Sequence, residues 1–413
     1  MTDQGIKNRN KSIAIFMVIV ALSGLALGLS DSVLSNYFRD AHDVYAFERG
    51  LIEFPRELPG VITVLLVSAL AFMGNIKLAL ISHALSIIGI FVLGLASPPF
   101  AVMLVFLFIN SLGMHMFFPI YDSMAMSLAK EDGFGAAMGR FNGLRIGFSM
   151  GAAILVFTGF RTGFFSFTTP IITIFVIAGV LFTGIFILLL YLKRYMVDTK
   201  AEKSRFVFRK AYIRFYLIAI LFGGRKQIMY VYGPWVLIEL LGFGADSMAL
   251  LMIAGAGLGI FFIPMVGRWI DKFGAARIMI IEAGLFLAIY LGYGIISAGV
   301  SGGWLVGATG VIALTVGISV VDRLTAQFGM VRSVYMRSIA KAPEDVTPTL
   351  ATGMALDHIV SIVSAIFCGF LWRELGPQYV FVFSGLLAVG YMLVARSIRK
   401  HDTPHAAKVG LAD

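Results

Sequence analysis

Twelve apolar segments follow one another along the chain, and this pattern restricts the possible fold more than any other feature. The segments cover residues 12–38, 50–74, 78–96, 101–128, 141–160, 171–192, 213–241, 248–266, 278–297, 304–331, 347–371 and 379–395. A helix needs about 20 mostly apolar residues to cross the hydrocarbon core of a bilayer. The sequence therefore predicts an all-α membrane protein with twelve transmembrane helices.

The composition is also that of a membrane protein. Apolar residues make up 59% of the chain and charged residues only 14%, and the mean hydropathy is +0.90. Soluble domains contain roughly 25% charged residues. The single cysteine, Cys368, lies inside an apolar segment, which excludes a disulfide framework and a cysteine-based metal site. The sequence predicts neither a cofactor nor a resident metal.

Lysine and arginine residues are distributed unevenly among the predicted loops. Nearly all of them would lie on one side of the membrane, and the exceptions are Arg39, Arg49, Arg161 and Arg373. Because cytoplasmic loops carry the excess of basic residues, we expect both termini to be cytoplasmic, in a bacterial inner (plasma) membrane. The net charge of +10 then reflects contact with anionic headgroups of the lipid bilayer, and no nucleic-acid partner is predicted.

A basic loop over residues 193–212 divides the chain into two sets of six segments, residues 1–192 and 213–413. The two sets share a short pattern: SLAKED at 127–132, and SIAK followed by ED at 338–345. Thirteen residues after the last Asp of each pattern come Arg145 and His358. Internal repeats with a binding site near their interface are common in secondary transporters. We therefore expect two six-helix bundles joined by a cytoplasmic linker.

The loop between the eighth and ninth segments, residues 267–277, reads GRWIDKFGAAR. It resembles the cytoplasmic loop signature of the major facilitator superfamily, G-x-x-x-D-(R/K)-x-G-x-x-(R/K). Together with twelve predicted spans and a basic central loop, the resemblance covers essentially the whole chain. It implies the fold of that superfamily, in which two helical bundles rock about a central cavity and open it alternately to either side.

The resemblance also implies roles for residues of this loop. Asp271 would stabilise one gating state, and Gly267 and Arg277 would belong to the same gate. From the residues alone, the glycines would allow a sharp turn. We also expect Asp271 near a helix N-terminus, where the helix dipole favours an acid. The corresponding loop of the first half, residues 73–77, is shorter and has no Asp.

Small residues recur at four-residue spacing in three segments, a pattern that allows membrane helices to approach closely. They are Gly143, Gly147 and Gly151; Gly255 and Gly259; and Ser361, Ala365 and Gly369. The resemblance implies that the fifth segment packs on the eighth and the eleventh on the second. Packing within one bundle is the alternative.

Charged residues inside the apolar segments are candidates for function, because such residues usually face a wet cavity or a partner. The seventh segment contains Gly223-Gly224-Arg225-Lys226-Gln227. Arg225 and Lys226 would donate hydrogen bonds to a carboxylate or phosphate of the solute, and Gln227 and Tyr230 would add hydrogen bonds and stacking. The alternative is that buried acids neutralise both cations, which then never touch the solute.

Asp357 and His358 are predicted to carry a coupling proton, because carboxyl groups and histidines inside proteins can exchange a proton near neutral pH. Asp31, in the first segment, is a third candidate for this role. A structural Asp–Arg or His–backbone contact that holds two helices together is the alternative for Asp357 and His358.

The fourth and fifth segments also carry polar candidates. His115 and Asp122 are two helical turns apart and share one helix face. His115 joins the candidates for solute binding, with satisfaction by a neighbouring group as the alternative. Asp122 is expected to form a structural pair with Arg145 of the next helix.

Two further pairs are expected to have structural or gating roles. Asp322 and Arg323 belong to a balanced set of buried charges, which survive inside a membrane when they are paired. Glu53 and Arg56 are expected to form a local i,i+3 pair at the outer mouth, in the position of a gate.

These features predict a secondary active transporter, not an enzyme, that moves a small anionic or zwitterionic solute by proton-coupled alternating access. Three alternatives stay open: multidrug efflux, a polytopic membrane enzyme acting on lipid, and a divalent-metal carrier with the ligands His115, Asp122, Asp357 and His358. The expected partners are the solute, protons or another coupling ion, and the bilayer. A monomer is expected.

Overall fold

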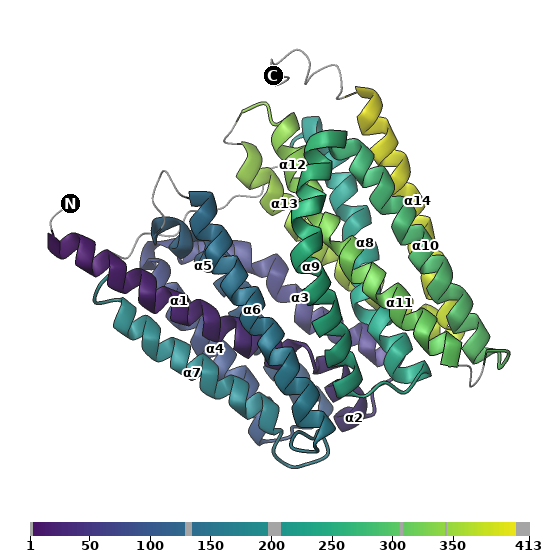
Figure 1. Cartoon of the computed structure of the whole chain (residues 1–413), viewed down its shortest axis with the longest axis horizontal. Coiled ribbons are helices and arrows are strands. Elements are labelled where there is room, and N and C mark those ends of the chain that lie inside the picture. Colours follow the sequence, from purple (N-terminus) through teal and green to yellow (C-terminus); the bar gives the residue numbers. More distant parts are fainter. Residues whose placement is uncertain (1–2, 129–133, 197–207, 306–308, 343–344, 402–413) are drawn as a thin grey trace. The chain divides into compact units, whose positions relative to one another are not determined.

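The computed structural model describes residues 3–128, 134–196, 208–305, 309–342 and 345–401. All regular structure in these ranges is helical (Figure 1). The first helices are α1 (Asp3–Asp31), α2 (Leu34–His42), α3 (Ala46–Ala69), α4 (Asn75–Leu95), α5 (Phe100–Leu128), α6 (Phe134–Arg161) and α7 (Thr173–Leu192). The remaining helices are α8 (Ile213–Trp235), α9 (Ala245–Phe273), α10 (Ala275–Ser301), α11 (Thr309–Thr325), α12 (Val331–Ile339), α13 (Val346–Glu374) and α14 (Pro377–His401). The predicted all-α class is confirmed.

Ten stretches of helix in the described ranges are long and apolar enough to cross a membrane. The helices α3 and α8 have comparable lengths, 24 and 23 residues, but contain several charged side chains. Glu53, Arg56 and Glu57 lie in α3, and Arg225 and Lys226 lie in α8. The expectation of twelve spans with cytoplasmic termini therefore stays a prediction. Whether these two helices cross the membrane depends on whether their charged side chains find partners inside the protein.

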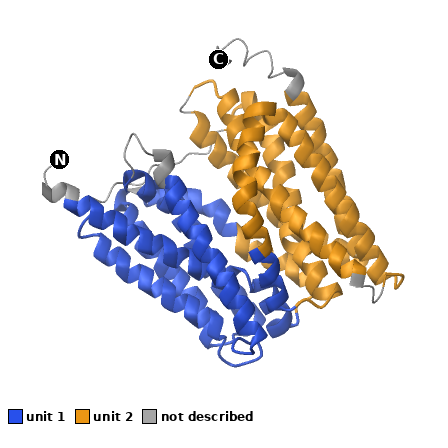
Figure 2. Cartoon of the chain, viewed as in Figure 1, with its two compact units in different colours: residues 1–43, 58–204, 244–253 blue, residues 44–57, 205–243, 254–413 orange. Residues whose placement is uncertain are grey.

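The chain divides into two compact units (Figure 2). Unit 1 comprises Met1–Asp43, Leu58–Ser204 and Gly244–Ile253, and unit 2 comprises Val44–Glu57, Arg205–Phe243 and Ala254–Asp413. The first part of α3 thus belongs to unit 2. The predicted bundles and linker stay predictions, because residues 197–207 of the linker lie outside the described residues. So do parts of the predicted sequence repeat, residues 129–132 and 343–344.

Three irregularities interrupt segments that the apolar pattern predicts as single helices. The first segment is divided after Asp31 into α1 and α2. A 3-10 turn, Ala326–Met330, separates α11 from α12. In α8, Pro234 has no backbone N–H to donate, and the helix continues as a π-helical turn at Val236–Leu240. An apolar pattern therefore gives the extent of a segment but not the breaks within it.

The two units repeat one packing pattern. In unit 1, α1 packs on α6 and α7, and α4 packs on α5 and α7. In unit 2, α8 packs on α13 and α14, and α10 packs on α11 and α14. Glycines permit close contacts in both: Gly24 of α1 meets the backbone of Arg145 in α6, and Gly223 of α8 meets Asp357 in α13. The packing supports the predicted internal repeat.

Matching glycine turns give a second sign of the repeat. Gly74 precedes α4 with φ 88° and ψ 158°, and Gly274 precedes α10 with φ 78° and ψ 155°. Three residues after each glycine comes a basic residue, Lys77 or Arg277. The loop of the first half therefore makes the same turn, although it is shorter and has no Asp.

These two turns can be tested by adding a methyl group. A residue other than glycine adopts this backbone region at a cost of about 1–3 kcal/mol. We expect Gly274→Ala and Gly74→Ala each to lower the thermal unfolding midpoint of the detergent-solubilised protein. Gly284→Ala is the matched control, because an added methyl in the middle of α10 meets open space. Equal midpoints for Gly274→Ala and Gly284→Ala would contradict the assignment.

Candidate functional site

The most deeply buried charges of unit 2 gather around Glu282 of α10. Arg225 of α8 donates from Nη2 to Glu282 Oε1 at 3.0 Å, and both side chains are 0% exposed. Tyr391 of α14 donates to Oε2 at 2.7 Å, and Arg332 of α12 lies 3.5 Å from Oε1. The Arg225 guanidinium also lies 3.5 Å from the ring centroid of Phe286. This Glu282 cluster connects four helices.

The Glu282 cluster changes the expectation for Arg225. Its side chain has no exposed surface in this structure, and a carboxylate and aromatic rings surround it. The geometry therefore favours a structural role over solute binding. Neither Glu282 nor Arg332 is among the residues predicted from the sequence. The available signal for Glu282 was a lone acid inside the apolar segment 278–297.

A second buried cluster surrounds Glu53, in the part of α3 that belongs to unit 2. Arg49 and Arg56 both donate to Glu53 Oε1, Arg56 at 2.7 Å, and Gln227 of α8 donates to Oε2 at 2.6 Å. Arg56 also donates to the Tyr230 hydroxyl at 3.1 Å. The predicted pair of Glu53 and Arg56 is present. Gln227 is occupied by Glu53, whereas Tyr230 keeps 45% of its surface exposed.

Two adjacent residues of α13 form pairs that remain partly exposed. Asp357 Oδ2 accepts a hydrogen bond from Lys226 Nζ of α8 at 2.6 Å, and these side chains are 21% and 38% exposed. His358 Nδ1 lies 2.7 Å from Glu57 Oε2 of α3, and these side chains are 15% and 12% exposed. The two predicted proton-coupling residues of α13 thus stand beside one another. Each has a partner of potentially opposite charge.

Gly223 and Gly224 explain how α13 comes so close to α8. A side chain at Gly223 would collide with the Asp357 carboxylate, and one at Gly224 would press on Ser364. Lys226 follows Gly223 by three residues, so both lie on the same face of α8. The glycine pair is therefore a notch that seats Asp357 against α8 within reach of the Lys226 ammonium.

Small residues also bring α13 against the first part of α3, within unit 2. A side chain at Gly50 would meet the Ala365 carbonyl, and one at Gly369 would meet the backbone of Ala46. Tyr232 of α8 donates to the Ala365 carbonyl at 2.6 Å. The implied contact between the eleventh and second segments is present here.

The candidates on α5 and α6 lie in unit 1. His115 Nδ1 lies 2.9 Å from the Ser111 carbonyl and 3.1 Å from its hydroxyl, so a neighbour on the same helix satisfies this nitrogen. Asp122 is exposed. The Arg145 guanidinium lies 5.9 Å from the ring centroid of Tyr121. Within the described ranges, Asp122 and Arg145 form no hydrogen bond but attract each other electrostatically, so the expected structural pair stays a prediction.

The remaining charged candidates lie in separate places. Asp322 and Arg323 are partly buried on α11 in unit 2. Because Gly255 of α9 has no side chain, there is room for the side chain of Arg323 beside it. Asp31 is partly buried at the end of α1 in unit 1. The roles expected for these three residues stay predictions.

The loop with the family signature differs from the expectation in one respect. Gly267 and Asp271 lie inside α9, which ends at Phe273, and Arg277 is in the first turn of α10. Asp271 is thus in the last turn of a helix, so the expected N-terminal position is wrong. The dipole disfavours an acid there. Gly274 alone makes the sharp turn, and gating by Asp271 stays a prediction.

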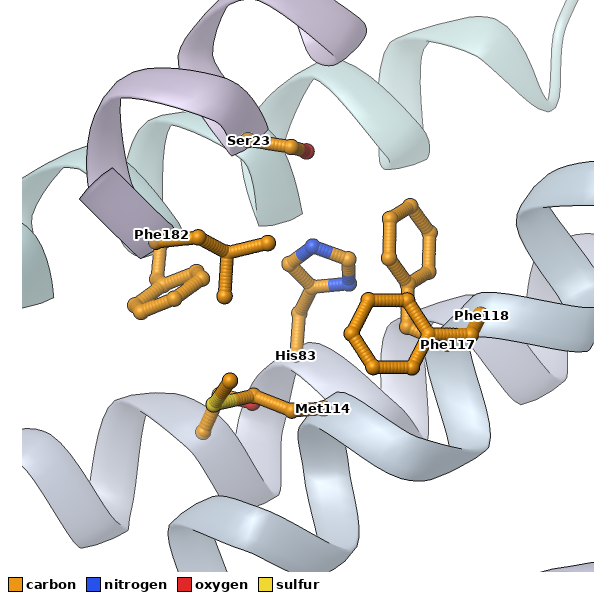
Figure 3. Close-up of a pocket in the computed structure, with 8 residues that line it drawn as sticks. Ser23, His83, Met114, Phe117, Phe118 and Phe182 are labelled. Carbon is orange, nitrogen blue, oxygen red and sulfur yellow. The ribbon is translucent and has the colours of Figure 1, made fainter. Parts of the chain in front are cut away.

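A small cavity in unit 1 lies beside His83 of α4, which no sequence pattern indicates (Figure 3). The buried His83 ring lies among Phe117, Phe118 and Phe182. Its Nδ1 lies 2.9 Å from the Ala79 carbonyl and therefore carries a hydrogen. The cavity volume is about 10 Å³, room for roughly one water molecule. Small-molecule sites have about 300–1,000 Å³, so this cavity is no solute site in this conformation.

The ligands of the alternative metal carrier do not gather in one place. In the described part of the chain, no three His, Cys, Asp or Glu side chains form a group that could hold a metal ion. His115 and Asp122 lie in unit 1, and Asp357 and His358 lie in unit 2. The four ligands are thus divided between the two units, and the divalent-metal carrier stays an alternative.

Apolar helices with paired charges inside them define a multi-pass membrane protein, and comparison with known proteins identifies its family. The family model of the Major Facilitator Superfamily matches residues 13–342. The chain belongs to this superfamily, and the resemblance in its loop sequence is confirmed. The family indicates a transporter rather than an enzyme acting on lipid. No curated protein matches the chain by sequence.

Solved transporters share the fold. The nucleoside transporter NupG has a TM-score of 0.71 at 14% identity, covering 93% of this chain and 98% of that one. A POT family transporter in complex with 5-aminolevulinic acid has a TM-score of 0.73 at 13% identity, covering 95% and 97%. A D-xylose-proton symporter has a TM-score of 0.64 at 16% identity, covering 93% and 95%. At these identities the likeness shows the fold alone.

The structural role of the Glu282 cluster can be tested with a neutral variant. Glu282→Gln leaves Arg225 buried without a countercharge, and breaking a buried pair in this way costs about 3–5 kcal/mol. We expect a markedly lower thermal unfolding midpoint or loss of folded protein. Glu374→Gln is the control, because Glu374 is exposed beside Arg373. A Glu282→Gln midpoint equal to that of Glu374→Gln would contradict the role.

Proposed function

We propose that the protein is a proton-coupled secondary transporter for a small organic solute with an anionic group, either an anion or a zwitterion. It would work by alternating access in the bacterial inner membrane, as a monomer. One observation carries the proposal: Asp357 and His358 are adjacent on α13, and each forms a partly exposed pair, with Lys226 and Glu57 respectively. The Glu282 cluster, by contrast, is fully enclosed around Arg225 and serves to hold helices together.

Charge balance connects the proton to the solute in this proposal. Lys226 is neutralised by Asp357, so an additional anion would add an unbalanced negative charge at a place where charges must be paired. A proton on Asp357 removes that carboxylate charge and frees the Lys226 ammonium for the solute. One anionic group and one proton then enter together, and the charge of the site is unchanged.

The neighbouring pair supplies a second proton position. His358 Nδ1 and Glu57 Oε2 are within hydrogen-bond distance, and histidine exchanges protons in the physiological range. A zwitterion would use the same groups differently: its ammonium would approach Glu57 or Asp357, and its carboxylate would approach Lys226. This set of groups supports both solute classes.

Tyr230 supplies the stacking surface in this proposal. Its ring is partly exposed, and Arg56 fixes it through a hydrogen bond to the hydroxyl and a guanidinium carbon 5.4 Å from the ring centroid. A planar part of the solute would stack on the free face of the ring. Gln227 acts indirectly, because it is held by Glu53.

Multidrug efflux is the weaker alternative. A carrier of lipophilic cations needs acids that are free of cations, whereas the partly exposed acids of α13 and α3 have basic partners in Lys226 and His358. The structural neighbours include nucleoside, peptide and sugar-proton carriers, so the fold by itself does not select the solute.

Transport into proteoliposomes under an imposed pH gradient tests the proposal. The panel should include labelled carboxylates, amino acids and lipophilic cations, with transport compared before and after the gradient is collapsed. Gradient-driven accumulation of a carboxylate or an amino acid would support the proposal. Accumulation of the cations alone would overturn it in favour of efflux.

Asp357→Asn separates coupling from binding. The variant cannot bind and release the proton, so we expect accumulation against a gradient to fall to the level of protein-free liposomes, while solute exchange at equal pH continues. Asp246→Asn is the matched control, because Asp246 is a partly exposed acid at the start of α9. If Asp357→Asn accumulates solute like the wild type, Asp357 has no coupling role.

A further inference from the structure

Arg145 of α6 has no carboxylate within hydrogen-bond distance among the described residues, unlike the cations of α3, α8 and α12. Its side chain is partly buried, and its Nε is buried without a hydrogen-bond partner. Its guanidinium lies 5.9 Å from the ring centroid of Tyr121 and also attracts the Asp122 carboxylate electrostatically. An aromatic face attracts a cation but accepts no strong hydrogen bond and removes no charge.

The comparable cations of α3, α8 and α12 in unit 2 each have a carboxylate at hand. Arg49 and Arg56 share Glu53, Arg225 and Arg332 share Glu282, and Lys226 binds Asp357. A guanidinium at the level of a membrane-spanning helix requires an anion or water, because lipid cannot solvate it. Asp122, the acid expected to pair with Arg145, is exposed and attracts the guanidinium without forming a hydrogen bond to it within the described ranges. The N–H groups of Arg145 are therefore not occupied by a carboxylate.

The internal repeat makes the position of Arg145 in unit 1 correspond to that of the proposed coupling residues in unit 2. Gly24 of α1 packs on the backbone of Arg145 in α6, as Gly223 of α8 packs on Asp357 in α13. By this correspondence, Arg145 occupies in unit 1 the place that the proposed coupling residues occupy in unit 2. The close contact at Gly24 also fixes the backbone that carries the guanidinium, which reduces the entropy lost on binding.

We infer that Arg145 binds the anionic group of the solute, a carboxylate or a phosphate. This inference rests on the proposed function and adds a residue to it. The guanidinium fork matches both groups with paired, charge-assisted hydrogen bonds. Lys226 requires a proton on Asp357 before it can accept an anion, whereas Arg145 requires none. Binding at Arg145 is therefore independent of the proton.

Thermal unfolding of the full-length protein in detergent measures this binding without transport. The probes are sodium acetate and inorganic phosphate, compared with sodium chloride at equal ionic strength. We expect at least one probe to raise the wild-type midpoint with saturation. In Arg145→Gln, the concentration for half of this rise should increase about tenfold or more, which corresponds to about 1.4 kcal/mol.

Two control variants show whether the change in anion binding is due to the guanidinium of Arg145. Arg161→Gln removes an exposed cation from the same helix and should respond like the wild type. Arg145→Lys keeps the charge but loses the fork, so it should fold and bind more weakly than the wild type. If Arg145→Gln does not fold, Arg145→Lys decides: wild-type affinity in Arg145→Lys, or in a folded Arg145→Gln, overturns the inference. So does the absence of any anion response in the wild type.

Two further comparisons distinguish solute binding at Arg145 from proton coupling and from lipid binding. Asp357→Asn frees the Lys226 ammonium, so its anion response should be at least as strong as that of the wild type, and a failure of proton coupling leaves the inference intact. In nanodiscs, the response should persist in phosphatidylglycerol as in phosphatidylcholine. If phosphatidylglycerol alone abolishes it, the bound group is a lipid phosphate, and the solute assignment is overturned.

Discussion

The structure depends on one constraint: an ion inside a membrane-spanning helix must find its countercharge within the protein. The helices α3 and α8 carry too many charges to enter lipid unaided. Arg225 of α8 and Arg332 of α12 share the Glu282 carboxylate of α10, and Arg49 and Arg56 of α3 share Glu53 of the same helix. In unit 2, the packing of the helices and the pairing of their charges therefore depend on each other. The charges decide which helices must be neighbours.

These charges fall into two groups, those that are fully buried and those that are partly exposed. The Glu282 cluster is sealed by aromatic rings and connects α8, α10, α12 and α14, so a ligand could enter only by breaking the packing. The pairs of Asp357 and His358 are partly exposed, and in the proposed function their partners would be exchanged for a proton or a solute group. Neighbouring residues of one helix, Arg225 and Lys226, thus face opposite environments because consecutive side chains point about 100° apart.

The sequence was a good guide to the fold and a partial guide to the site. Apolar segments and the loop at 267–277 led to the class and the family, because hydrophobic length and a glycine turn are local properties. Asp357 and His358 stood out as ions in an apolar segment. The partner of Arg225 could not be predicted, because Glu282 lies 57 positions away and only packing brings them together. Asp271 was misplaced because helix ends are the least certain feature of a sequence.

The notch at Gly223 has a mechanical consequence. The Asp357 carboxylate lies against Gly223 while Lys226 donates to the same carboxylate, so this contact joins α8 and α13 near the middle of α8, in addition to the hydrogen bond from Tyr232 to Ala365. A side chain at position 223 would force the two helices apart at this point. In the proposed function, protonation of Asp357 would remove the ion pair with Lys226 and so weaken one of the contacts that hold α13 against α8.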